Sequence, residues 1–403
     1  MTPRAAQRRP ALRSAWSDLT LAVPLARRNL LADKRRLVRS ISGVAFAALL
    51  MMVELGFRNA FIDSMLLAVR QLDADILLIG KMKYEFGRDA PFPRRQLYQA
   101  RALPGVASAR PLYAERTASL WKNPQTHQTY TVQVFAFDPD EPIFLLPEIN
   151  ANLSALRRPD TLMADRRARS FIGQAVSGTE TELARRNIQV VGTFSLGPNF
   201  FADGTVIMSD RNFASLLTGK GTGETQLPEV EVGVVKVRPG YDVPTVQRML
   251  QAAMADDVSV LTKAELLDRE AGFHAQVSSV GPIFGVGVLV GFAVGMMISY
   301  QIIFADLTDQ LPQYATMKAM GYHDSTLIRI VLQQATLYAI AGYIPAWILC
   351  GLIFRGLDAV ALLPMEMSAG LTAISFSLTA LMCVASALVA ARRVIAADPA
   401  EVF

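Results

Sequence analysis

The residues that most often perform chemistry in proteins are few and scattered in this chain. The three histidines are His127, His274 and His323, and none has a partner at the spacing of metal ligands. The two cysteines, Cys350 and Cys383, fall inside apolar stretches, which favours buried thiols over a disulfide framework. No nucleophile elbow and no pair of carboxylates stands out. The sequence therefore predicts neither a catalytic site nor a metal site.

A loop for binding nucleotide phosphates is also missing from the sequence. The pattern G-x-x-x-x-G-K-[ST] occurs nowhere, and Gly219-Lys220-Gly221 does not fit it. We therefore expect no cofactor in this chain and no enzymatic activity of its own. If ATP drives the protein, a separate polypeptide must bind the ATP and its Mg²⁺.

The composition indicates a membrane protein. Of 403 residues, 52% are hydrophobic and only 19% are charged, whereas soluble domains carry roughly a quarter charged residues. The net charge is +5, and the first 39 residues hold ten Lys and Arg against two Asp. Because these basic residues precede an apolar stretch, they predict an arm that flanks a membrane rather than a nucleic-acid-binding surface.

Four stretches are long and apolar enough to cross a bilayer, which takes about 20 residues. We expect transmembrane spans at 37–57, 273–305, 330–354 and 367–391. A signal peptide is the alternative for the first span, but its basic region would be too long and no A-x-A-like site follows.

Basic residues beside the spans predict the orientation of the chain. Both the N-terminal arm and the segment after the last span are basic, so both ends are expected in the cytoplasm of a multi-pass inner-membrane protein of bacteria. The expected organisation adds five segments: a basic cytoplasmic arm with an amphipathic helix (1–36), a periplasmic domain (58–272), a cytoplasmic loop (306–329), a short periplasmic turn (355–366) and a cytoplasmic C-terminus (392–403).

The large outer segment has the pattern of a mixed α/β domain. Alternating or continuous apolar runs predict strands, and two apolar stripes at helical spacing predict helices. The β-α-β run near its end indicates a small split sheet packed on helices. The expected strands are 75–79, 128–137, 230–237 and 258–261, and the expected helices are 94–101 and 243–254.

Small residues recur at helical spacing in the second span. Gly287, Gly291 and Gly295 lie four residues apart and so share one helix face, where a second helix can approach closely. The sequence leaves two partners open: another copy of this chain in a homodimer, or the first span of the same chain. The first span contains one acidic residue, Glu54, for which we expect a position near the membrane surface, with a proton or substrate role as the alternative.

The inner loop and several further motifs resemble one family. The loop DLTDQLPQYATMKAMGY covers residues 306–322, with a turn at Pro312 and a helix that ends at Gly321. Together with the motifs below, which span essentially the whole chain, it resembles the FtsX-like/MacB-type permeases of ABC transporters, and most closely the DevC-type permeases. These motifs are GFRNAF, LWKNPQT, FDPDEP, FADGTVIMSDRNF, GPIFGVGVLVGFAVG, YATMKAMGY and ADPAEVF.

The resemblance implies a MacB-like mechanotransmission architecture, with four membrane helices and a large α/β domain between the first two. It further implies a homodimer that works with a cytoplasmic ABC ATPase, a periplasmic membrane-fusion adaptor and an outer-membrane channel, in contact with membrane lipids. In the family the inner loop is a coupling helix that sits in a groove of the ATPase. The matching residues are Gln313, Tyr314, Ala315, Thr316, Met317, Lys318, Ala319, Met320 and Gly321, with Gln313 at a position where the family commonly has Glu.

Other functions remain open at this point. A related permease extracts lipoproteins from the membrane, and an FtsX-like protein regulates a cell-wall hydrolase. A membrane sensor is a poorer match, because only a dozen residues follow the last span. The sequence does not identify the cargo, which ranges from glycolipids and peptides to siderophores and drugs.

Overall fold

The structure is a computed structural model that describes residues 34–116, 119–218, 227–361 and 365–395. The chain divides into two compact units, with boundaries at residues 57/58, 282/283, 356/357 and 365/366. The predicted N-terminal arm (1–36) lies almost entirely outside the described residues, as does most of the predicted C-terminal segment (392–403).

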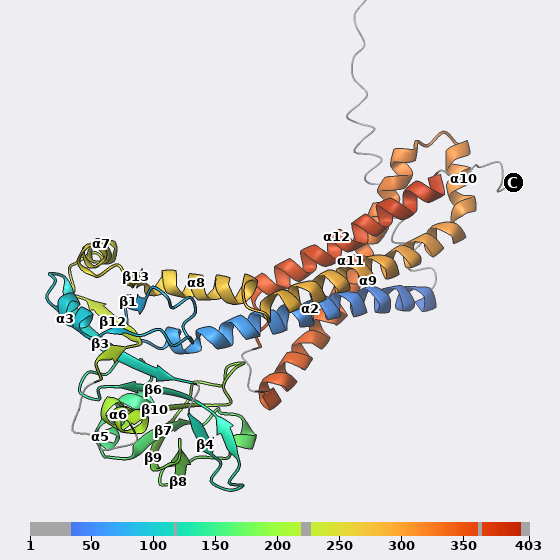
Figure 1. The fold of residues 1–403 in the computed structure, drawn as a ribbon. Coiled ribbons are helices and arrows are strands. Elements are labelled where there is room, and N and C mark those ends of the chain that lie inside the picture. The colour runs from blue at the N-terminus through green and yellow to red at the C-terminus, as the bar shows by residue number, and fades with distance from the viewer. Residues whose placement is uncertain (1–33, 117–118, 219–226, 362–364, 396–403) are drawn as a thin grey trace, which may run out of the picture. The chain divides into compact units, whose positions relative to one another are not determined.

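The first unit is helical. Four of its helices are long and apolar enough to cross a membrane, because each contains an 18-residue stretch of high hydropathy with at most two charged residues. The helices that contribute to this unit are α2 (Lys34–Arg70), α9 (Gly281–Asp309), α10 (Leu311–Ala319), α11 (Asp324–Ala361) and α12 (Ala369–Ile395). The predicted fold class, four membrane helices with a large α/β domain between the first two, is confirmed (Figure 1).

The helix bounds differ from the predicted spans, and α11 extends beyond both ends of the predicted span 330–354. Helix α2 continues 13 residues beyond position 57, to Arg70, because no Gly or Pro interrupts residues 58–70. The predicted span 273–305 is interrupted near its start. Helix α8 (Lys263–Gln276) ends there, and α9 begins at Gly281. A Cβ atom on Gly281 would lie 2.0 Å from the carbonyl oxygen of His274, so only glycine fits this break.

The second unit is built on an eleven-stranded sheet in the order β13-β1-β12-β3-β6-β10-β7-β9-β8-β4-β5. Strand β3 joins its two halves, because Val106–Leu112 pair with β12 whereas Tyr113–Glu115 pair with β6. The strands are β1 (Ile76–Gly80), β3 (Val106–Glu115), β4 (Leu120–Lys122), β5 (Thr129–Thr131), β6 (Gln133–Phe137), β7 (Thr161–Asp165), β8 (Glu180–Leu183), β9 (Arg186–Phe194), β10 (Thr205–Ser209), β12 (Val232–Val237) and β13 (Val258–Thr262), and a separate pair joins β2 (Phe92–Pro93) to β11 (Glu229–Val230).

The central strands of this sheet are buried on both faces. Alternate residues of one strand enter different apolar cores: Ile76 and Leu78 of β1 enter the first, and Leu77 and Ile79 the second. The first core is covered by α3 (Arg95–Arg101), α6 (Asp210–Thr218) and α7 (Val243–Ala253). The second is covered by the end of α2, by α8, and by the short helices α4 (Pro147–Asn150) and α5 (Leu153–Leu156). A 3₁₀ turn, η1 (Ser170–Ile172), completes the unit.

The local predictions for this unit are mostly confirmed. The predicted helices 94–101 and 243–254 correspond to α3 and α7, and the strands at 75–79 and 258–261 to β1 and β13. The predicted strand 128–137 is wrong as a single element. The chain changes partner at the buried Val132, so that β5 pairs with β4 whereas β6 pairs with β10 and β3. The predicted strand 230–237 is likewise divided at Glu231.

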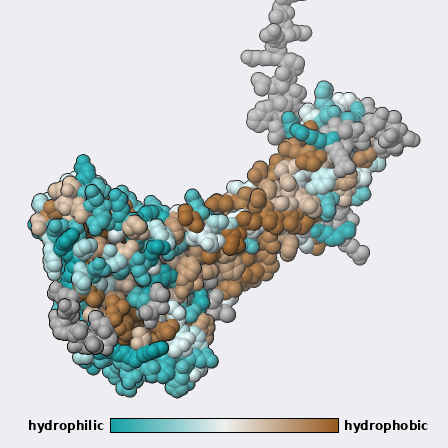
Figure 2. Space-filling model, viewed as in Figure 1, coloured by the Kyte–Doolittle hydropathy of each residue, from teal (hydrophilic) through white to brown (hydrophobic). Residues whose placement is uncertain are grey.

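The surface composition of the two units follows their architecture. Hydrophobic side chains gather over the long helices, and hydrophilic ones cover the sheet unit (Figure 2). Exposed apolar residues on α9 include Ile283, Val286, Leu289 and Val290. Such exposure is costly in water but suits contact with lipid tails.

Candidate functional site

The segment that links α9 to α11 forms a short, well-terminated helix, α10. Pro312 lies in its first turn, where the missing N–H costs nothing. Gly321 follows the helix with a φ of +91°, its N–H donates to Lys318, and the N–H of Tyr322 donates to the carbonyl of Met317. These two bonds form a Schellman motif, so the predicted glycine cap at Gly321 is confirmed.

The two faces of α10 have different environments. Tyr314 and Ala315 are buried in the apolar core of the helical unit. Gln313, Thr316 and Met320 are exposed, and their spacing places them on one stripe. The predicted contact set 313–321 therefore contains an inner and an outer group, a division that a linear motif does not reveal. The side chain of Ala319 lies outside the described part of the structure.

Two further residues of the predicted set have intermediate positions. Met317 is half-buried and packs against the same apolar core. Lys318 forms an ion pair of 3.1 Å with Asp324 in the first turn of α11. Neither side chain is therefore a free surface contact.

A buried carboxylate that the sequence pattern does not reveal lies beside α10. Asp306, in the last turn of α9, is only 5% exposed and accepts a hydrogen bond from the hydroxyl of Tyr338 on α11, which is 4% exposed. Tyr314 of α10 is close enough for the charge to matter, because burial and then Asp306 raise its pKa to about 12. The sequence places Asp306 in the loop because it follows an uncharged stretch. The hydropathy of the chain does not indicate that its side chain is buried.

The glycine face of α9 packs within the chain. A Cβ atom on Gly291 would lie 2.7 Å from Leu50 of α2, and one on Gly295 would lie 2.7 Å from Ala47. Within this chain α2 lies against this face and Met382 of α12 also contacts Gly295, whereas a contact with a second copy stays a prediction. Close approach of this kind is what small residues permit between membrane helices.

Glu54 lies on the same contact. A Cβ atom on Gly287 would lie 2.5 Å from its carboxylate, and the side chain is half-buried. Glu54 thus rests against α9, and α2 continues for 16 residues beyond it, about 24 Å of helix at 1.5 Å per residue.

The sheet unit contains one buried ionisable cluster. Glu270 of α8 is 1% exposed and accepts the N–H of Phe86 at 2.8 Å, and burial raises its pKa. His274, one turn later, is 2% exposed, and burial together with Arg116 lowers its pKa to about 4. Its Nδ1 has no partner in the described part of the structure and faces a cavity of about 20 Å³, room for one water.

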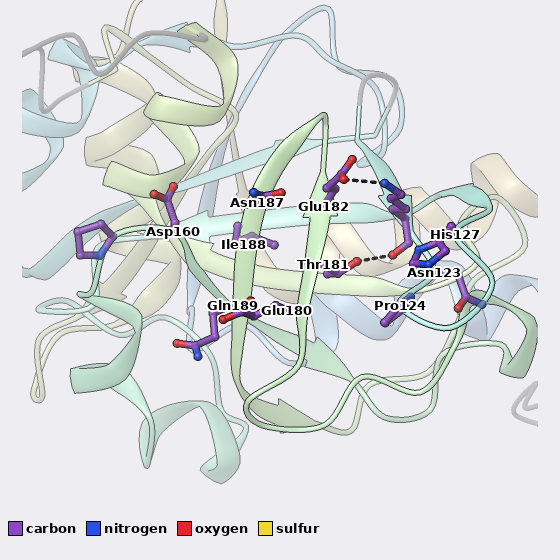
Figure 3. Close-up of a pocket in the computed structure, with 12 residues that line it drawn as sticks. Asn123, Pro124, His127, Asp160, Glu180, Thr181, Glu182, Asn187, Ile188 and Gln189 are labelled. Carbon is purple, nitrogen blue, oxygen red and sulfur yellow. Dashed lines mark hydrogen bonds and ion pairs between the residues drawn. The ribbon is translucent and has the colours of Figure 1, made fainter.

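A polar groove of about 550 Å³ lies over β4, β8 and β9 of this unit (Figure 3). Three of its charged groups form ion pairs: Lys122 bridges to Glu182 at 2.6 Å, and Asp160 pairs with Arg186. Glu180, which also lines the groove, is exposed. Figure 3 shows His127 apart from Glu180 and Gln189.

The described residues were found to contain no candidate metal site. No group of three or more His, Cys, Asp or Glu side chains in them has the arrangement of a metal site. Cys350 and Cys383 are both buried in the helical unit.

Part of the chain matches a protein-family model, and about half of it is similar to solved structures. Residues 283–399 match the family model described as FtsX-like permease C-terminal. Among solved structures, the chain is similar to the periplasmic region of MacB from Actinobacillus actinomycetemcomitans (9% identity, 50% of this chain and 94% of that one, TM-score 0.33). It is also similar to the extracellular domain of the noncanonic ABC-type transporter YknZ from Gram-positive bacteria (10%, 47% and 98%, TM-score 0.30). No curated protein matches the sequence significantly.

Proposed function

We propose that this chain, whose residues 283–399 match the family model described as FtsX-like permease C-terminal, is the permease subunit of an ABC-type exporter. It acts as a homodimer of DevC type in the bacterial inner membrane, with both termini in the cytoplasm. A separate ATPase binds the ATP and Mg²⁺. In this proposal the work of the chain is to carry a change of shape from the ATPase to the sheet unit on the far side of the membrane.

The observation that carries the proposal is the two-faced environment of α10. Its inner face, with Tyr314 and Ala315, is anchored in the core of the membrane helices, while Thr316 and Met320 point outward. A partner that displaces the outer face must therefore displace the helices as well, since packed interiors transmit strain.

Export through an adaptor and an outer-membrane channel is the form of the function that we favour. In the described spans some polar side chains bond to a neighbouring helix: Tyr343 donates to the carbonyl of Thr372, and Ser386 to that of Met296. Side chains used in this way do not line a hydrophilic pore. Cargo is then expected to be moved from the periplasm or the outer leaflet rather than through the bilayer.

Isolation of the native complex tests the proposal. The tagged full-length chain, extracted from source membranes in mild detergent, should bring down an ATPase, an adaptor and a channel, identified by mass spectrometry. Met320→Asp should reduce the recovered ATPase at least tenfold, because it places a charge on an apolar contact. Ser325→Asp, which adds the same charge at an exposed position off α10, is the matched control.

The composition of the complex also separates the alternatives. A cell-wall hydrolase in place of adaptor and channel would support the regulatory function, and a bound lipoprotein would support extraction. Isolation without any ATPase, or unchanged recovery with Met320→Asp, would count against the coupling role.

A further inference from the structure

Helices α9, α10 and α11 are connected in sequence and are also joined by a side-chain bond across the loop. The hydroxyl of Tyr338 on α11 donates a hydrogen bond to the carboxylate of Asp306 on α9, 32 residues away in sequence. The coupling helix lies between the two in the chain. The hydrogen bond therefore links the two helices that flank α10.

This bond lies in an apolar environment. Leu307, Tyr314, Val331 and Tyr338 belong to the same buried core of the helical unit. A carboxylate in such a place is unfavourable unless it is hydrogen-bonded, and a well-packed apolar pair would often be at least as stable. Stability alone therefore does not account for Asp306.

Geometry suggests what the carboxylate does. A hydrogen bond has a preferred distance and angle, whereas apolar side chains slide past one another with little change in contact area. A hydrogen bond across an apolar interface therefore favours one register of the two helices. Tyr314 packs α10 into the same apolar core as Tyr338 and lies close enough to Asp306 for its charge to act on the Tyr314 hydroxyl.

We propose that Asp306 and Tyr338 are positioning residues that lock α9 and α11 to each other, so that both helices follow α10 when a partner displaces it. The proposal rests on the proposed function for its biological meaning. The lock itself is a property of this chain alone.

Three variants separate positioning from packing. Tyr338→Phe removes the hydroxyl and keeps the ring. Tyr343→Phe is the matched control, since Tyr343 lies on the same helix and hydrogen-bonds to Thr372 and Ser375 of α12 rather than to α9. The double variant Asp306→Leu/Tyr338→Phe replaces the polar pair with an apolar one.

The experiment measures the distance between α9 and α11 in the full-length chain in lipid nanodiscs. Spin labels are placed at Thr308→Cys on α9 and Ser325→Cys on α11, both exposed, with Cys350 and Cys383 changed to alanine. Tyr338→Phe is expected to widen the distance distribution at least twofold, while Tyr343→Phe leaves it unchanged. The double variant should remain folded, with an unchanged elution volume. Its distance distribution should be as wide as that of Tyr338→Phe.

Other results would overturn the proposal. A Tyr338→Phe distribution as narrow as that of the parent would do so, as would equal widening by Tyr343→Phe. A narrow distribution in the double variant would show that packing suffices. Because this measurement needs no ATPase, failure of the lock is distinguishable from failure of the proposed function, which would appear as absence of an ATPase from the native complex.

Discussion

At the scale of single residues, burial determines which charged side chains matter in the sheet unit. Lys83 is 2% exposed and forms an ion pair of 2.5 Å with the buried Glu231, 148 residues away in sequence. The pair holds the loop before β2 against the junction of β11 and β12. Loss of one partner would leave the other charge buried and uncompensated, which is far more costly than loss of an exposed pair.

His274 provides a pH-dependent prediction at this scale. Because its pKa falls from 6.5 to about 4 in the folded chain, the unfolded chain takes up a proton first on acidification. Its contribution to stability is therefore complete above pH 6.5 and is lost as the pH falls towards 4, by an amount on the order of 2 kcal/mol. Glu270 acts in the opposite sense, since burial raises the pKa of its carboxyl group.

The measurement compares the parent with His274→Phe. Phenylalanine keeps a ring against Phe61 and Phe273 but does not titrate. Between pH 7.5 and 5, the thermal unfolding midpoint of the full-length protein should fall less in His274→Phe than in the parent. The fluorescence of the buried Trp121 reports on the sheet unit. Equal losses in the two proteins would refute the assignment.

At the scale of elements, the contact between α2 and α9 depends on glycine. Gly291→Ile should force α2 and α9 apart, because even a Cβ atom lies 2.7 Å from Leu50, and overpacking of this kind costs about 1–3 kcal/mol. Gly285→Ile is the control on the same helix, since a Cβ atom there meets nothing within 4 Å. A lower thermal midpoint in detergent is expected for Gly291→Ile only, and equal midpoints would contradict the packing.

The cap of α10 gives a second prediction for an element. Gly321→Ala keeps open space around the side chain but places alanine at a φ of +91°, a left-handed conformation that costs about 1–2 kcal/mol. Amide hydrogen exchange in residues 314–320 should accelerate by roughly 5- to 30-fold.

A matched glycine controls for the backbone cost itself. Gly240→Ala has a φ of +93° and equally open surroundings, but it lies in the sheet unit. Exchange in α10 should remain unchanged in that variant. Unchanged exchange in Gly321→Ala would show that the Schellman motif does not stabilise α10.

The choice of α10 substitutions follows from its faces. Met317 belongs to the predicted contact set, but it packs against the helical core. A charge there would disturb the bundle as well as any contact with a partner. The exposed Met320 is the sharper site, because its side chain is 65% exposed and its loss affects the outer surface only.

At the scale of the whole molecule, the proposed function requires the sheet unit and the segment that contains α10 to lie on opposite sides of the membrane. A cysteine at position 180, exposed on β8, should react with a membrane-impermeant maleimide in intact spheroplasts. A cysteine at position 323, exposed between α10 and α11, should react only after permeabilisation. Both parent cysteines are buried, so background labelling should be low. Labelling of position 323 in intact spheroplasts would reverse the proposed orientation.

Several features of this protein could be predicted from the sequence because they depend on contiguous residues. Four spans follow from runs of about 20 apolar residues, since transfer into a bilayer is close to a sum over neighbouring side chains. The end of α10 at Gly321 follows from a single residue that tolerates positive φ. Helices α3 and α7 and strand β1 follow from local periodicity.

Only the tertiary structure decided which distant residues meet. Residues far apart in sequence meet where β3 pairs with both β12 and β6, and where Lys83 forms an ion pair with Glu231. Such long-range pairing also divides the segment 128–137 at Val132. The same holds for the bond from Tyr338 to Asp306, a carboxylate that looks like a loop residue in sequence. Such contacts depend on the packing of whole elements and on the burial it produces. Packing and burial are not properties of neighbouring residues, so hydropathy and residue spacing do not predict these contacts.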